Sequence, residues 1–410
     1  MDAILLYLVA MVTLQHLKLC AYRGAVAGVC VALGLLAMSP ARAGAAQVAF
    51  AGLAYSGDFR SIEARFPNSR RFEESLKRTN SSINELLVKS LKESPPKHFD
   101  LVFDNLLSLK GSDQVIAVAL VITEETVSSE GFGQFRKLFI QFSGQAMFFD
   151  FKSMTVLRAY PITFAYIDAI DRESTDSEMN ARISAVYFGA KGKPGIVARF
   201  TEQLSKASLP TPASRYIQVA RVHLSPQTLE ALPDKLKSSQ GTAATWVADY
   251  LSEALSSKTG VPILPYAKGY TIGNILSMRI ADGTVFELKL PKPDYELSID
   301  VTDMKKVLYG NTPAGASYIY GVYVSLTLEE PLSGRVYLRS NFKNGEVKVV
   351  PASQEHVDDF PAYTDSLRGL FTKLSTIVAG ASNAWLKASA AAPDIEKQLS
   401  DTREVLRLCK

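Results

Sequence analysis

The chain passes twice through one order of predicted elements: a strand, a helix, a short strand, a group of antiparallel strands and a closing helix. The two passes lie on either side of Leu209-Pro210-Thr211-Pro212-Ala213-Ser214, in which the two prolines give a short, stiff linker. This order predicts an α+β protein with two domains related by a tandem repeat, each a mainly antiparallel sheet packed by helices. Two unrelated α+β domains would produce much the same pattern, and that alternative stays open.

In the first half, the periodicity of apolar residues locates most elements. Asn80, Ser81 or Ser82 can cap a helix over residues 83–91, which Pro95-Pro96 ends. The Arg-rich stretch over residues 59–78 is interpreted as a polar loop. Strands are predicted over residues 47–55, 99–103, 114–126, 137–142, 146–151 and 155–167, with a bend at Ser143-Gly144, a turn at Lys152-Ser153, and further helices over 176–187 and 196–207.

In the second half, helices are predicted over residues 245–258 and 364–389. Strands are predicted over residues 216–224, 261–264, 318–328 and 334–350, with Lys343-Asn344-Gly345-Glu346 as a hairpin turn. A sheet-like stretch over 275–301 is interrupted by turns at Asp282-Gly283 and Pro291-Lys292-Pro293. A charged terminal helix follows Pro393. The predicted division is a signal segment over 1–43, a first domain over 44–209, a linker over 210–215, a second domain over 216–389 and a helical tail over 390–410.

Residues 1–43 have the pattern of a secretory signal peptide. Lys18 and Arg23 precede an apolar run over residues 25–38, and Ser39-Pro40-Ala41-Arg42-Ala43 supplies a helix breaker and the small residues that signal peptidase recognises. Cleavage is predicted after Ala43. This pattern predicts an exported, periplasmic bacterial protein.

A second apolar run, over residues 3–14, lies ahead of the basic pair and has no Lys or Arg before it. We interpret it as an upstream extension of the start site. The alternative is that both runs stay in the membrane and anchor the protein, although each is shorter than the roughly 20 apolar residues that a spanning helix needs. Membrane contact is expected only if this N-terminus is retained.

Removal of residues 1–43 lowers both the net charge and the number of cysteines. Three basic side chains and one acidic side chain leave, so the formal charge falls from +4 to +2. No dense block of Lys and Arg remains, which argues against a nucleic-acid partner. Cys409 is then the only cysteine, so the core must come from the 47% of hydrophobic residues rather than from disulfides. We expect its thiol to be free in a loosely attached tail.

The sequence contains no recognisable catalytic motif. His98, His223 and His356 are far apart, and Asp358-Asp359 after His356 is interpreted as an acidic loop before Pro361 rather than as a metal site. Nucleophile elbows and Cys-His pairs are absent from the sequence. We therefore predict a protein without enzymatic activity, cofactor or metal. A periplasmic hydrolase or carbohydrate-active enzyme with a dispersed site is the alternative.

Four tyrosines form the candidate binding surface. Tyr318, Tyr320 and Tyr323 lie on one predicted strand and Tyr337 on the next. A row of tyrosines on an uncovered sheet face would suit recognition of a protein or glycan, because each ring combines apolar area with a hydroxyl. The alternative is that most of these rings belong to the core, as alternate residues of a covered sheet do.

Strand ends and turns in the first half form a further pattern. The segments that carry it are Val48-Ala49-Phe50-Ala51-Gly52-Leu53-Ala54-Tyr55-Ser56-Gly57-Asp58, Asn84-Glu85-Leu86-Leu87-Val88-Lys89-Ser90-Leu91, residues 99–103, Gly111-Ser112-Asp113-Gln114-Val115-Ile116-Ala117-Val118-Ala119 and Phe148-Phe149-Asp150-Phe151-Lys152-Ser153-Met154-Thr155-Val156-Leu157. Over residues 47–167 this pattern resembles the N-terminal domain of the TolB translocation protein and the related curli-secretion and penicillin-binding-protein-activator lipoproteins.

The resemblance implies a fold and a non-enzymatic role in envelope assembly or secretion, with no specific functional residue. The chain departs from those lipoproteins at Gly44-Ala45-Ala46, where they carry a lipid-modified cysteine, and no β-propeller repeat follows. We therefore expect an exported protein that binds another envelope component, most simply an envelope protein.

The cleavage site can be tested by N-terminal sequencing of protein from a periplasmic extract. We expect the mature chain to begin at Gly44, because Ala41 and Ala43 are the small residues at the two positions that signal peptidase reads. Ala43→Arg should leave a longer chain, whereas the control Ala46→Arg should not. A wild-type start other than Gly44 or Ala46 would overturn the export assignment.

Overall fold

The computed structural model describes residues 46–410 except 58, 104–114, 133, 191, 210–213, 238–241, 267–270, 273–274, 281–282, 353, 355–356 and 382–383. The signal segment with Ala43, most of the predicted linker, and His356 lie outside the described residues. Among the described helices, none is long and apolar enough to cross a membrane.

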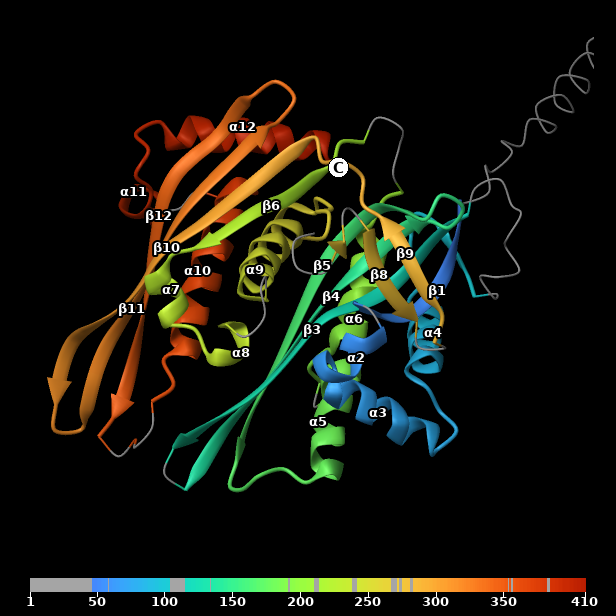
Figure 1. Cartoon of the computed structure of the whole chain (residues 1–410), viewed down its shortest axis with the longest axis horizontal. Coiled ribbons are helices and arrows are strands. Elements are labelled where there is room, and N and C mark those ends of the chain that lie inside the picture. Colours follow the sequence, from blue (N-terminus) through green and yellow to red (C-terminus); the bar gives the residue numbers. More distant parts are fainter. Residues whose placement is uncertain are drawn as a thin grey trace, which may run out of the picture. The chain divides into compact units, whose positions relative to one another are not determined.

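The first sheet is built by strands of the first half of the chain (Figure 1). Its strands are β1 (Gln47–Ser56), β2 (Asp100–Val102), β3 (Ile116–Phe132), β4 (Phe135–Asp150) and β5 (Thr155–Ile170), in the order β2-β1-β3-β4-β5. β1 runs parallel to β2 and β3, whereas β3, β4 and β5 form an antiparallel meander.

The second sheet repeats this strand order. Its strands are β6 (Ile217–Leu224), β10 (Tyr295–Thr312), β11 (Gly315–Glu330) and β12 (Arg335–Pro351). β6 runs parallel to β10, and β10, β11 and β12 are antiparallel. An isolated parallel bridge from Gln218 to Leu264 stands where β2 stands in the first sheet. The α+β fold that the sequence predicts is therefore confirmed.

Three strands encoded in the second half pair with the first sheet instead. They are β7 (Thr271–Ile272), β8 (Ile275–Ile280) and β9 (Val285–Lys289). β8 pairs with β1, and β9 meets β5 through Thr155 and Lys289. The strands β1, β3, β4, β5, β9 and β8 thus form a closed ring around an apolar core that includes Ala117, Phe149 and Met278.

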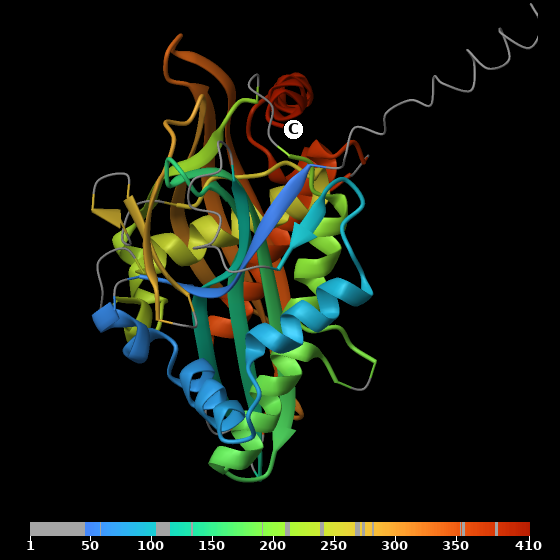
Figure 2. The same cartoon turned by 90° about the vertical axis from the view of Figure 1, so that its right-hand side faces the viewer.

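The other face of the first sheet is covered by helices (Figure 2). These are α2 (Phe59–Arg65), α3 (Pro67–Lys77), α4 (Ile83–Glu93), α5 (Asp176–Phe188) and α6 (Ile196–Lys206). Ser82, one of the three residues predicted as possible caps, caps α4 in a reciprocal pair with Glu85. Residues on alternate sides of each strand therefore enter two separate cores, one under the helices and one inside the ring.

The loop predicted over residues 59–78 is wrong, because α2 and α3 occupy it. Phe66 and Phe72 are buried among the core residues that these helices share with the sheet. The Glu125 carboxylate on β3 accepts hydrogen bonds from the backbone N–H groups of Asn68 and Ser69, each at 2.9 Å. A partner distant in sequence thus satisfies the first free donors of α3.

Helices of the second half are α7 (Pro226–Glu230), α8 (Asp234–Lys237), α9 (Thr242–Thr259), α10 (Phe360–Val378), α11 (Trp385–Ser389) and α12 (Ile395–Leu408). The long helices α9, α10 and α12 share one core with the second sheet. α9 also contacts β5 of the first sheet. The helix predicted over 364–389 is divided in two, and Gly380 adopts a φ of 111° just after α10 ends.

The expected loose tail is also wrong. α12 places Ile395, Leu399 and Leu406 in the core of the second half, and Cys409 is 1% exposed. Burial raises the pKa of the Cys409 thiol to about 12. The thiol is free, but it is packed rather than frayed.

The hairpin turn predicted at Lys343-Asn344-Gly345-Glu346 is wrong, because β12 continues through it, and β4 continues through the bend predicted at Ser143-Gly144. Both glycines serve close approach rather than a turn. A Cβ at Gly144 would lie 2.8 Å from the Val121 carbonyl oxygen, and one at Gly345 would lie 3.1 Å from a methyl group of Ile319. The predicted strand over 261–264 is reduced to the single bridge at Leu264.

Arg158 of β5 joins the first sheet to segments far away in the chain. This arginine is 3% exposed. Its guanidinium donates to the Ser208 carbonyl at 3.0 Å, to the Ser214 hydroxyl at 3.1 Å and to the Lys410 carbonyl at 2.8 Å. One buried side chain therefore connects both ends of the linker and the residues that follow α12.

Replacing this arginine tests the connection. We expect Arg158→Met to lower the free energy of unfolding by about 1–3 kcal/mol, because the Ser208 and Lys410 carbonyl oxygens lose charged donors. The measurement is urea unfolding followed by circular dichroism. Arg339→Met removes an exposed arginine from β12 and should change stability by less than about 0.5 kcal/mol. Equal effects of the two substitutions would contradict the role of Arg158.

Candidate functional site

The structure separates the four predicted tyrosines. Tyr320 is fully buried: its ring packs on Tyr363 of α10 at 5.1 Å between centroids, and its hydroxyl donates to Asp359. Tyr318 is half-buried on the same face of β11, with its ring centroid 6.5 Å from that of Tyr320. Tyr337 is half-buried against Tyr295 at 5.9 Å.

Tyr323 lies on the opposite, uncovered face of the sheet and is 38% exposed. Strand alternation explains the division, because side chains an even number of residues apart share a face and those an odd number apart do not. The four rings therefore do not make one exposed row. The Lys305 ammonium lies 5.5 Å from the Tyr323 ring centroid, and that lysine pairs with Asp303 at 2.7 Å.

A different part of the second sheet carries the exposed apolar surface. We define the distal ribbon as residues 305–312 of β10, 315–320 of β11 and 345–351 of β12. Residues 307–328 contain no Asp, Glu, Lys or Arg. The exposed apolar side chains of the ribbon are Val307 (53%), Leu308 (56%), Tyr309 (71%), Val347 (60%) and Val349 (63%).

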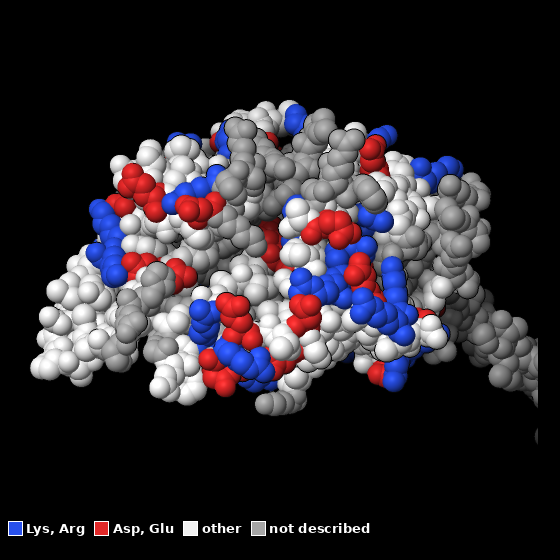
Figure 3. Space-filling view, turned by 60° about the horizontal axis from the view of Figure 1, so that its bottom comes forward, with Lys and Arg blue, Asp and Glu red and all other residues white. Residues whose placement is uncertain are grey.

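The ribbon extends beyond the part of the sheet that other elements cover. β6 pairs with β10 only as far as Val301. Figure 1 shows the ends of β10, β11 and β12 continuing past that point at the lower left. In Figure 3 the same side of the molecule ends in a lobe without charged side chains. Exposed apolar side chains gathered at one end of a sheet are typical of an interaction site.

Contacts at its base and tip hold the ribbon in place. Lys306 donates to both carboxylate oxygens of Asp359 at 2.9 Å, and the hydroxyl of Tyr320 donates to the same carboxylate. Burial, reinforced by that carboxylate, raises the pKa of Tyr320 well above its ordinary value, so the phenol stays protonated as a donor. At the tip, the Thr312 hydroxyl donates to the Gly315 carbonyl at 3.0 Å.

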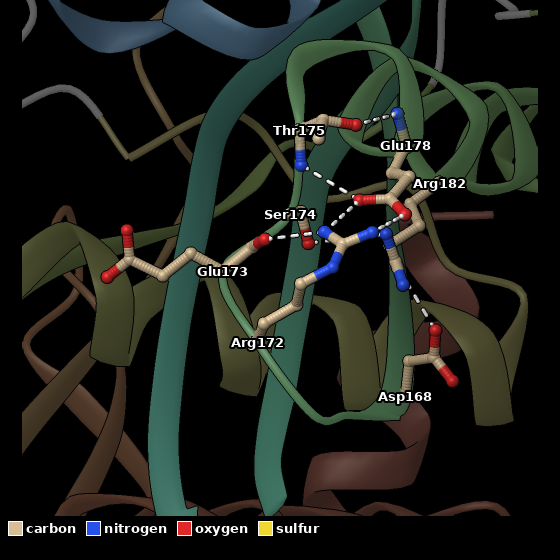
Figure 4. Close-up of polar contacts among 7 residues, drawn as sticks. All are labelled: Asp168, Arg172, Glu173, Ser174, Thr175, Glu178 and Arg182. Atoms are coloured by element: carbon tan, nitrogen blue, oxygen red, sulfur yellow. Dashed lines mark hydrogen bonds and ion pairs between the residues drawn. The ribbon is translucent and has the colours of Figure 1, made fainter.

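A charged network fixes the turn from β5 into α5 (Figure 4). Thr175 caps α5 in a reciprocal pair with Glu178. Arg172 donates to both carboxylate oxygens of Glu178, at 2.9 and 2.7 Å, and is the main reason that the pKa of Glu178 falls to about 2. Arg182 reaches back to Asp168 at 3.0 Å and to the Ser174 hydroxyl at 3.2 Å.

This network borders a surface hollow of about 260 Å³, which Phe135 and Ile170 also line. Phe135 is 59% exposed at the end of β4. Each arginine in Figure 4 already binds a carboxylate of the same turn. We therefore assign the network a structural role: it fixes the start of α5 rather than offering a free charge to a ligand.

A polar seam separates α9 from the first sheet. Its sheet side consists of Gln141, Ser143 and Gln145, all buried on one face of β4. The Tyr250 hydroxyl on α9 donates to the Gln141 side chain at 3.2 Å. Figure 3 shows a hollow on the face of the molecule that it views, with acidic side chains at its base.

Asp249 of α9 is the unusual group of this seam. Part of the residue is accessible, but its Oδ2 atom is fully buried and accepts no hydrogen bond from the described residues. Burial and the nearby Glu124 carboxylate raise the pKa of Asp249 to about 8, against the opposing effect of Arg65. Ionisation would place negative charge on the buried Oδ2 atom, away from water, so the carboxyl stays neutral at pH 7.

Within the described part of the chain, no group of three or more His, Cys, Asp or Glu side chains could hold a metal ion. His98 and His223 are exposed and separate. Asp358 and Asp359 lead into α10 instead: the Asp358 carboxylate accepts from the Phe360 N–H, and Asp359 binds Lys306.

The sequence matches no protein-family model, and no curated protein matches it. Solved structures give remote likenesses. A Xanthomonas campestris protein of family model DUF330 is 15% identical over 42% of this chain and 87% of its own, with a TM-score of 0.21. A Helicobacter pylori neuraminyllactose-binding hemagglutinin homologue is 11% identical over 44% and 91%, with a TM-score of 0.26.

A minor lipoprotein from Acinetobacter baumannii is 9% identical over 40% of this chain and 89% of its own, with a TM-score of 0.19. The neighbours named here are thus bacterial proteins that include DUF330 and lipoprotein kinds, and they do not include the TolB, curli-secretion or penicillin-binding-protein-activator kind expected from the pattern over residues 47–167. TM-scores this low do not establish a shared fold.

Asp249 gives a pH-dependent test of the seam. The unfolded carboxyl ionises near its ordinary pKa of 3.8, whereas the folded one stays protonated up to about 8. Over that interval the native state holds a proton that the unfolded state has lost, so this residue lowers stability as the pH rises. Asp249→Asn should therefore stabilise the protein at pH 7 by on the order of 2 kcal/mol and much less at pH 4.5.

The measurement is urea unfolding of wild type and variant at both pH values. Asp234→Asn, at an exposed position of α8, is the matched control and should show no such pH dependence. A gain for Asp249→Asn that is equal at the two pH values would contradict a neutral Asp249 in the fold.

Proposed function

We propose that this protein is an exported, non-enzymatic envelope protein that binds another envelope protein through the β10–β11 end of the distal ribbon. The observation that carries the proposal is the exposure of Val307, Leu308 and Tyr309 on a ribbon end without charge. When a partner covers water-exposed apolar side chains, their removal from water favours binding. We assign the protein to assembly or secretion at the envelope.

The form of the ribbon supports binding rather than catalysis. Tyr309 is the most exposed of its apolar residues, at 71%, and tyrosine is enriched at protein interfaces because its ring is both rigid and amphipathic. Lys306 and Asp359, a charged pair at the base, bind each other. The ribbon end therefore presents an apolar surface to a partner rather than a reactive side chain.

The cell compartment supports the same proposal. The signal pattern over residues 1–43 directs the chain out of the cytoplasm, and a mature chain with one buried cysteine needs no oxidative folding. An apolar ribbon end on an exported protein meets other envelope proteins rather than cytoplasmic ones.

Site-specific photocrosslinking in living cells tests this function. We place p-benzoylphenylalanine at Tyr309 and, as a matched control, at Leu332, which is 95% exposed at the turn between β11 and β12 of the same sheet. We expect a discrete adduct with one envelope protein from position 309 and none from position 332. Leu308→Asp should reduce that adduct at least about ten-fold, because it brings a charge into the interface.

Two results would contradict the proposal. Identical adducts from positions 309 and 332 would show that the label reports exposure alone. Adducts only with phospholipid from position 309 would assign the ribbon end to a membrane surface instead of a protein.

A further inference from the structure

We propose that a hollow on the uncovered face of the second sheet binds an acidic sugar, with Tyr323 against the sugar ring and Lys343 paired with the carboxylate. The hollow has a volume of about 290 Å³ and lies on β10, β11 and β12 at the base of the distal ribbon. Val307, Leu308 and Tyr309, which are assigned to the envelope partner, do not line it. The inference therefore goes beyond the proposed function and does not depend on it.

Strand register brings the polar lining of this hollow together. Tyr323 of β11 lies directly opposite Lys343 of β12. On the other side of Tyr323, β10 has a bulge at Thr302, whose hydroxyl donates to the Tyr323 carbonyl at 3.2 Å. One row further along, Asn341 of β12 lies opposite Ser325. Neighbouring strands thus place an aromatic ring, an ammonium group, a hydroxyl and an amide around one hollow.

The far wall of the hollow is residues 388–391, at the end of α11 and just after it. The Ala391 N–H donates to the Asn341 carbonyl at 2.9 Å, and Ala390 forms an antiparallel bridge with Phe342. These contacts fix the wall against the edge of β12. Three of its four residues are alanines, and the fourth is Ser389, so no long side chain fills the space beside them.

Tyr323 provides the apolar surface of the hollow. The residue is 38% exposed, and its hydroxyl makes no hydrogen bond within the described part of the chain. A Cβ added at Gly321, the next residue of β11 on this face, would lie 3.6 Å from the Cε2 atom of the ring. The ring therefore lies along the strand. A tyrosine in this position offers apolar area to the C–H groups of a sugar and a hydroxyl to its polar groups.

Lys343 carries a charge that the described residues do not neutralise. Of the described residues that line the hollow, only Lys343 is charged, and its ammonium group has no partner among them. The neighbouring Lys305 is paired with Asp303 at 2.7 Å. Asp300 of β10 lies opposite Ser325, one row away, and does not line the hollow. A ligand carboxylate would complement the free ammonium group through a charge-assisted hydrogen bond.

Asn341 supplies donors for the hydroxyl groups of a ligand. Its Oδ1 atom accepts from the Ser325 hydroxyl, whereas its Nδ2 group has no partner among the described residues. A side-chain amide nitrogen carries two donors, and a sugar hydroxyl can accept either. A few placed polar groups beside an apolar surface are typical of small-molecule sites. Ring, amide and single cation together match a hydroxylated ring with one carboxylate, which is a uronic acid.

The first experiment is ligand-observed saturation-transfer NMR of the purified mature chain with three probes. Glucuronic acid has the ring, the hydroxyl groups and the carboxylate, glucose has the ring without the charge, and acetate has the charge without the ring. We expect glucuronic acid to bind with a dissociation constant of about 1 mM. Glucose should bind about five-fold more weakly, because it forms no ion pair with Lys343. Acetate should bind at least about ten-fold more weakly, because it leaves the ring of Tyr323 uncovered.

Charge variants test the role of Lys343. Lys343→Gln should weaken the binding of glucuronic acid about five-fold and leave that of glucose unchanged, because only the acid uses the ammonium group. Lys397→Gln removes the same charge from an exposed position on α12 and should change neither affinity. The preference for the acid over glucose should therefore disappear in the first variant and persist in the second.

Ring variants test the role of Tyr323. Tyr323→Ala should weaken the binding of glucuronic acid and of glucose alike, by about ten-fold, because the apolar contact with the ring does not depend on charge. Tyr323→Phe keeps the ring and should retain most of the affinity for both sugars. Equal losses in these two variants would contradict a contact between the sugar and the ring.

The absence of saturation transfer from the wild type to glucuronic acid at about 20 mM would overturn the proposal. So would acetate that binds as tightly as glucuronic acid, since any carboxylate, including that of a peptide, would then suffice. Equal affinity for glucose and glucuronic acid, or equal effects of Lys343→Gln and Lys397→Gln, would contradict the assigned ion pair. These measurements use the purified chain and small probes alone, so their failure is distinguishable from the failure of envelope crosslinking at Tyr309.

Discussion

Both faces of the first sheet carry buried apolar side chains, and this requires two separate covers. On β4, Phe148 faces the helices while Met147 and Phe149 face the opposite way, into the ring of strands. A sheet buried on both sides cannot leave either face in water without losing the hydrophobic contribution of that face. The chain meets the requirement with helices α2 to α6 on one side and with the hairpin β8–β9 on the other.

That second cover comes from the other half of the chain, and much of the remaining architecture depends on it. β8 pairs with β1, α9 contacts β5, the Ile263 N–H donates to the Ala159 carbonyl at 2.8 Å, and Arg158 binds the Lys410 carbonyl. The insertion between α9 and β10 that interrupts the repeat is thus the part that ties the two repeats together.

Local sequence patterns predicted most of the fold, and they failed where contacts with residues distant in the chain determine the structure. The sequence predicted most of the strands, a cap among Asn80, Ser81 and Ser82, and the repeated order, because alternation and capping are local properties. The sequence could not reveal α3, because the first turn of this helix depends on Glu125 of the distant strand β3. Nor could it reveal that β12 continues through Asn344-Gly345, where the side-chain amide of Asn344 donates to the Ser366 carbonyl of α10. Both need a partner that the local sequence does not contain.

The tyrosines singled out from the sequence and the exposed apolar residues of the ribbon lie on the same sheet, but they are different residues. Tyrosine spacing singled out Tyr320, which the fold buries, and passed over Tyr309, which it exposes. The uncharged run over residues 307–328 was the available signal, since surface strands in water normally carry charge on one face. Exposure itself follows from how far β6 extends along β10, and no local pattern encodes that length.

Pairing of β1 with β8 also sets an order of events for the chain. Ala54 of β1 pairs with Ile280 of β8, so β1 lacks this neighbour until a segment more than two hundred residues later in the chain is available. Contacts so distant in sequence form late, because the entropy of closing a long loop must be met first. Until then the inner face of the first sheet is an open apolar surface, and an exported chain would pass through that state outside the cytoplasm. The first half of the chain is therefore prone to aggregation until the β8–β9 hairpin covers this face.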